Sequence, residues 1–138
     1  MKTASILVMV TRVIGPILLL LGGLFWTGTA YQLLPLHIGL GVLLVLILWT
    51  MAALAARAGA KRGMVAFAIA WGALMPWFGM AQANHFPGQY HWAIRVLHLA
   101  VGVVAMGLVD GLGKQVRRRG AAAATDGSRD VREGRATA

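Results

Sequence analysis

The residues best suited to chemistry in this sequence are its four histidines. His37 and His98 each fall within a long apolar segment, whereas His85 and His91 flank a Pro87-Gly88 turn between two such segments. Ionisable side chains inside a membrane span are rare and usually functional, and neutral imidazole is a common metal ligand. His37 and His98 are therefore the candidate metal ligands, and His85 and His91 are expected in a solvated loop.

Other catalytic and ligating groups are scarce. The sequence has no cysteine, which excludes thiolate metal sites, iron–sulfur clusters and c-type haem attachment. Its four acidic residues are Asp110, Asp126, Asp130 and Glu133, and none falls in the middle of an apolar segment. This distribution argues against a carboxylate proton relay and a di-iron carboxylate site. Asp110 is within reach of Lys114, four residues later on a helix.

The elements that must position these histidines are predicted by composition. Hydrophobic residues make up 59% of the 138 residues and charged residues only 12%, too apolar a balance for a soluble domain of this size. Segments of about 20 apolar residues cross a bilayer as helices. We therefore expect an all-α, polytopic membrane protein, a bundle of four transmembrane helices at about 13–31, 36–56, 64–83 and 92–112.

The cations predict an orientation in the cell membrane. Lys and Arg precede or open the first span, join spans two and three, and follow span four, whereas the other two connections carry no charge. By the positive-inside rule both termini are cytoplasmic. The net charge of +9 is thus assigned to topology and to lipid contact rather than to nucleic acid. Residues 1–119 form the expected membrane domain, with the first span retained rather than cleaved as a signal peptide. Residues 120–138 are expected to be a disordered cytoplasmic tail.

Spans two and four resemble each other in sequence. Both contain the pattern Leu-His-x-x-x-Gly-Val, at 36–42 and 97–103. Glycines seven apart occur in span one, at Gly15 and Gly22, and in span three, at Gly72 and Gly79. These patterns suggest two helical hairpins in a parallel repeat. Chance recurrence of short apolar words is the alternative. The glycine faces favour close helix contacts, and they are compatible with a homo- or hetero-oligomer.

Because spans two and four run in the same direction, His37 and His98 are expected to approach from one side, near the outer face. Gly41 and Gly102 follow them by four residues, on the same helical face and one turn deeper. Such glycines leave room for a flat macrocycle. Arg95, one turn before His98, either pairs with a haem propionate or extends to lipid phosphate. The competing interpretation is that His37 is a polar interface residue and His98 bonds a carbonyl of a neighbouring helix.

This constellation resembles the four-helix membrane b-type cytochromes, such as the cytochrome b561-like group, in which histidines on transmembrane helices hold haem b. The resemblance covers the four-span core and implies one haem b on His37 and His98, with Gly41, Gly102 and Arg95 around it. It implies electron exchange with a quinol or an outer-face redox partner. The sequence has no histidine towards the cytoplasmic side, so a second haem is not implied. The alternative is a structural or assembly subunit without a cofactor.

Overall fold

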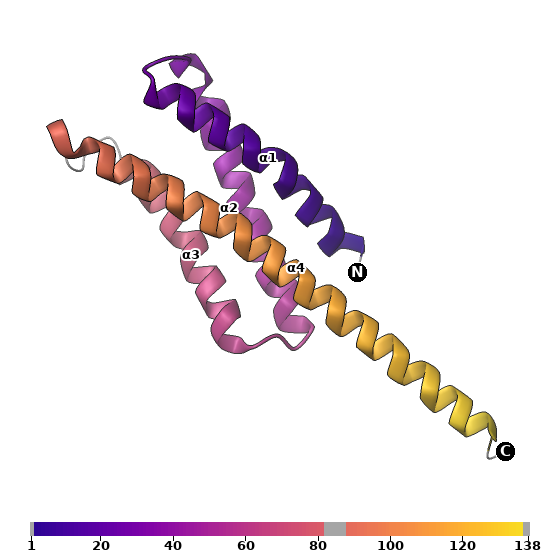
Figure 1. Ribbon diagram of the computed structural model, residues 1–138. Helices are drawn as coiled ribbons and strands as arrows, with labels where there is room; N and C mark the ends of the chain where they lie inside the picture. The colour runs from indigo at the N-terminus through magenta and orange to yellow at the C-terminus, as the bar shows by residue number, and fades with distance from the viewer. Residues whose placement is uncertain (1, 82–87, 137–138) are drawn as a thin grey trace.

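The computed structural model describes residues 2–81 and 88–136, and these residues are helical apart from short turns. Two hairpins make up the chain (Figure 1). The first joins α1 (Lys2–Trp26) to α2 (Leu34–Arg57) through the short 3₁₀ helix η1 (Tyr31–Leu33), and the second joins α3 (Arg62–Ala81) to α4 (His91–Ala136), which η2 (Gly88–Tyr90) precedes. The described residues contain no strand. The all-α class is therefore confirmed, and four helices are long and apolar enough to cross a membrane.

Glycines in the left-handed conformation end two of the helices. At the end of α1, Gly28 has a φ of 80°, and the amides of Gly28 and Thr29 donate to the carbonyls of Phe25 and Leu24. This is the Schellman arrangement, which only glycine adopts without steric cost. Gly59, with a φ of 77°, ends α2 in the same way. The first helix thus lies earlier than the expected span at 13–31, whereas the next two lie within a few residues of theirs.

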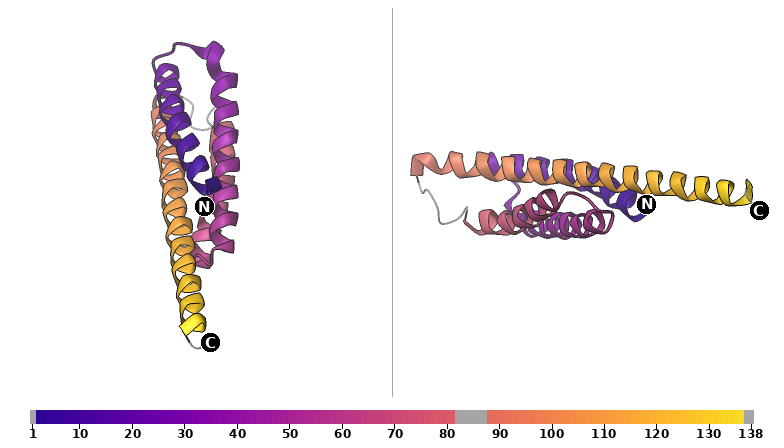
Figure 2. Two further views of the ribbon diagram at one scale, coloured as in Figure 1. Left: turned by 90° about the vertical axis from the view of Figure 1, so that its right-hand side faces the viewer. Right: turned by 90° about the horizontal axis from the view of Figure 1, so that it is seen from below.

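The helices form two layers. In Figure 2, α1 and α4 lie side by side in one layer, and α2 and α3 lie in the other. The α2 and α4 helices also pack against each other, so the two helices that carry the candidate histidines are neighbours. The two 3₁₀ helices η1 and η2 lie at one end of the bundle, which we call the η end. The α2–α3 turn lies at the opposite end, which we call the turn end.

The tightest packing is towards the turn end. The largest fully buried side chains lie in the second half of α2 and the middle of α4: Leu44, Leu48, Met51, Val109 and Leu112. Small residues let the backbones approach there. A Cβ atom added at Gly113 of α4 would lie 2.5 Å from Cγ2 of Val8 in α1. Many large apolar side chains elsewhere are exposed, as expected for helices surrounded by lipid.

The last helix departs from the expected domain division. The sequence predicts a disordered segment at 120–138, whereas the structure continues α4 as a helix through Ala136, past the other three helices (Figure 2). The physical reason lies in Ala121–Ala124, because alanine has the highest helix propensity and no proline follows to stop the helix. Polar composition argued for disorder, but helix propensity decides the backbone conformation here.

Candidate functional site

The structure brings His37 and His98 together at the η end of the bundle. His37 lies in the first turn of α2 and His98 in the second turn of α4. Their ring centroids are 6.3 Å apart and the rings are tilted by 40°. Both side chains are partly buried. The juxtaposition predicted from two helices of the same direction is thus present, with one imidazole supplied by each hairpin.

A glycine of the adjacent helix lies behind each ring. A Cβ atom added at Gly22 of α1 would lie 3.9 Å from Cε1 of His37, and one added at Gly79 of α3 would lie 3.8 Å from Cε1 of His98. The edge of Phe25 also contacts His37, with centroids 5.4 Å apart. The sequence pointed to Gly22 and Gly79 only as helix-contact residues. The spacing of seven residues from Gly15 to Gly22 and from Gly72 to Gly79 indicates a helix contact. It does not show which side chain Gly22 or Gly79 faces.

Each imidazole has an unmet requirement for a polar partner. The Nδ1 atoms of His37 and His98 are both buried, and neither has a hydrogen-bond partner within the described part of the chain. Burying an imidazole nitrogen without a partner costs free energy, and such groups in folded proteins usually mark a bound ligand, ion or water. The alternative prediction was that His98 bonds a carbonyl of a neighbouring helix, and Nδ1 of His98 makes no such bond among the described residues.

Open space lies one turn beyond each histidine. A Cβ atom added at Gly41 or at Gly102 would meet nothing within 4 Å, although both residues are partly buried. Each of these two glycines therefore has room for at least one added carbon atom beside the backbone. Arg95 lies one turn before His98 on α4 and is partly buried. His91 is the first residue of α4 and is not paired with the two candidates, while His85 lies outside the described residues.

The ligand count limits what kind of metal centre the pair can form. The described residues contain no group of three or more histidine, cysteine or acidic side chains that could hold a metal ion. Structural zinc needs about four protein ligands. Two imidazoles suffice where a macrocycle supplies the remaining ligands, as in haem. Two imidazoles that held one metal ion would have ring centroids roughly 6 Å apart, and the observed centroids are 6.3 Å apart.

Comparison of the chain with protein-family models, with curated proteins and with solved structures gives no match. Its function must therefore be inferred from its own residues.

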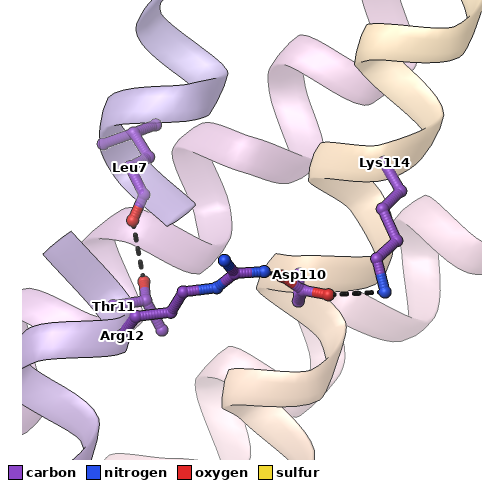
Figure 3. Close-up of polar contacts among 5 residues, drawn as sticks. All are labelled: Leu7, Thr11, Arg12, Asp110 and Lys114. Carbon is purple, nitrogen blue, oxygen red and sulfur yellow. Dashed lines mark hydrogen bonds and ion pairs between the residues drawn. The ribbon is translucent and has the colours of Figure 1, made fainter. Parts of the chain in front are cut away.

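A second polar cluster lies nearer the turn end, between α1 and α4 (Figure 3). Asp110 accepts a 2.7 Å hydrogen bond from Nη2 of Arg12 through Oδ1, and Nζ of Lys114 lies 2.8 Å from its Oδ2. The predicted contact between Asp110 and Lys114 is confirmed. From the sequence, Arg12 is one of the cations that precede or open the first span. Its pairing with a residue 98 positions away carries no local sequence signal.

Proposed function

We propose that this chain is a small integral membrane b-type cytochrome, or the haem-bearing subunit of a larger complex. In this proposal His37 and His98 would hold one haem b. The observation that carries it is the pair of imidazoles, one from each hairpin, with ring centroids 6.3 Å apart. Bound haem would supply one-electron transfer to a quinol or to another redox partner.

The chain's own residues would have distinct tasks in holding the group. Gly22 and Gly79 let α1 and α3 approach the imidazoles and so fix the ring positions. Gly41 and Gly102 leave the space that a flat ring would occupy next to the backbone. Arg95, one turn from His98, would pair with an acidic substituent of the macrocycle. Apolar surroundings exclude water and so help set the reduction potential of such a centre.

The orientation follows from the distribution of cations over the bundle. Arg57, Lys61 and Arg62 surround the α2–α3 turn, and Lys114 and Arg117 lie on α4 at the same end. No residue of η1 or of the described part of the α3–α4 connection is charged. The positive-inside rule places the turn end in the cytoplasm. The histidine pair would then lie near the outer face, with both termini cytoplasmic.

Equivalent contacts in the two hairpins support a parallel repeat. Gly22 faces His37 within the first hairpin as Gly79 faces His98 within the second. The contacts between the two hairpins also correspond. Arg12 and Asp110 join α1 to α4. In the same way, Nε1 of Trp49 in α2 donates to the carbonyl of Ile69 in α3. Residues 12 and 69 are 57 apart, as are Gly22 and Gly79. Residues 49 and 110 are 61 apart, as are the two histidines. One offset thus relates α1 to α3 and another relates α2 to α4.

The proposal is tested by the visible spectrum of the purified full chain from haem-supplemented cells. We expect a Soret band that shifts and sharpens on reduction with dithionite, and we expect His98→Ala to abolish it. His91→Ala is the matched control, because His91 lies on the same helix outside the pair, and it should leave the spectrum unchanged.

A colourless preparation of the folded chain would reject the cytochrome assignment and leave the cofactor-free structural subunit. Retention of the band in His98→Ala would reject His98 as a ligand. Circular dichroism of each variant establishes that the helices are intact.

A further inference from the structure

A groove of about 430 Å³ lies between α1 and α4. Apolar side chains line most of it, including Val8, Pro16, Leu19 and Met106, and Arg12 and Asp110 lie at its polar end. Thr11 adds no free donor, because its hydroxyl bonds the carbonyl of Leu7 (Figure 3). The volume is within the range of ligand sites, roughly 300 to 1,000 Å³. The groove is therefore amphipathic, with one charged end and an apolar body.

The charged end has an excess of positive charge. Two cations, Arg12 and Lys114, share the single carboxylate of Asp110. The next acidic residue along α4 is Asp126, sixteen residues further, or about 24 Å at 1.5 Å per residue. The Arg12 side chain is 67% exposed, and one of its five N–H donors is used in the contact with Asp110. The cluster can accept an additional anion without displacing Asp110.

The charged end also lies at the depth of lipid headgroups. Trp92 is the second residue of α4, near the η end, and Asp110 follows eighteen residues later, about 27 Å further along the helix. The hydrocarbon core of a bilayer is about 30 Å thick. With Trp92 at one interface, Asp110 lies at the other, and the apolar body of the groove extends from there into the hydrocarbon.

We propose that this groove binds one anionic phospholipid of the cytoplasmic leaflet. Arg12, which lines the groove, would bind its phosphate, and Lys114 would add positive charge from its place on Asp110. An acyl chain would lie along Pro16, Leu19 and Met106. Basic pockets between helices on the cytoplasmic side have the chemistry that anionic headgroups require. A quinol headgroup is neutral and would leave the excess charge unmatched. This inference rests on the membrane orientation proposed above but not on haem binding.

The test is native mass spectrometry of the full chain in detergent, titrated with phosphatidylglycerol or with phosphatidylcholine. We expect one phosphatidylglycerol to bind per chain, with phosphatidylcholine binding at least fivefold more weakly. Arg12→Gln should weaken phosphatidylglycerol binding roughly fivefold, since one surface cation is lost. Asp110→Asn should have the opposite effect, because it removes the carboxylate that competes with the phosphate. The His98→Ala chain should bind the lipid normally, which separates this test from that of haem.

Arg62→Gln is the matched control, because Arg62 is an exposed cation at the turn end that does not line the groove. Leu19→Trp fills the groove and leaves the ion pairs in place, and it should also reduce lipid binding. Equal effects of Arg12→Gln and Arg62→Gln would overturn the proposal, as would equal retention of the two lipids. If inorganic phosphate displaced bound phosphatidylglycerol as effectively as added phosphatidylglycerol does, the apolar groove would play no part in binding. That result would also overturn the proposal.

Discussion

Replacing Gly102 by leucine tests whether the open space beside the histidines holds a ligand. Gly102 lies one turn beyond His98, and an added Cβ would meet no protein atom within 4 Å. The chain without a cofactor therefore has room for the Cβ atom of the leucine. If haem occupies that space, the leucine side chain must displace it or push it away from the His98 ring. Overfilling a packed site costs about 1–3 kcal/mol, which corresponds to a loss of haem affinity of roughly 5- to 150-fold.

Gly107 provides the matched control on the same helix. It lies nine residues from His98, on the opposite face of α4, and an added Cβ there also meets nothing within 4 Å. Haem titration followed at the Soret band should show the loss for Gly102→Leu and not for Gly107→Leu. Thermal unfolding of the two haem-free variants, followed by circular dichroism, should agree within a few degrees. Equal haem affinities in the two variants would refute the assignment of Gly102 to the ligand space.

Three further predictions concern packing and topology. Gly113→Ala should lower the unfolding temperature by several degrees, because the new Cβ would lie 2.5 Å from Cγ2 of Val8 and overpacking costs about 1–3 kcal/mol. The control Gly107→Ala should not lower the unfolding temperature. Trp71→Phe should destabilise the chain by about 1 kcal/mol, measured by denaturant titration, because Nε1 of Trp71 donates a 2.9 Å bond to the carbonyl of Val101. The chain has no cysteine, so single cysteines can report the membrane orientation. A maleimide that does not cross the membrane should label Gln32→Cys in intact cells and Ser128→Cys only after permeabilisation. The reverse pattern would contradict the orientation.

The helices and their number follow from the sequence because their signal is local. Runs of about 20 apolar residues predict spans, and Gly28 and Gly59 occupy positions where a helix commonly ends in a left-handed residue. The helix that carries the first predicted span, α1, begins before that span and ends at Trp26, ahead of Gly28. A single cation near a helix end does not stop a helix, and α1 begins at Lys2.

The histidine pair was predictable in outline, but its surroundings were not. Two helices of the same direction bring His37 and His98 to one end of the bundle, and that inference needs only topology. Which residues lie behind the rings depends on how each helix is rotated about its axis. For this reason Gly22 and Gly79 carried no specific signal. The contact between Arg12 and Asp110 likewise depends on the packing of α1 against α4 rather than on sequence distance.

The separation of the tight core from the histidine pair has a functional consequence. The largest fully buried side chains of α2 begin at Leu44, seven residues beyond His37, and those of α4 begin at Val109, eleven beyond His98. Helix packing in membranes depends on close contact between small and apolar residues. The largest fully buried side chains lie towards the turn end, while a smaller buried cluster of Phe78, Ile94 and Val101 joins α3 to α4 nearer the η end. The η end is less constrained, with unpartnered Nδ1 atoms and open space at Gly41 and Gly102. A fold held together at the turn end can leave its ligand site unfilled and remain assembled. The haem-free chain should therefore stay helical in detergent and bind haem when haem is added afterwards. If the helices instead assembled only in the presence of haem, the contacts that stabilise the bundle would have to lie at the η end.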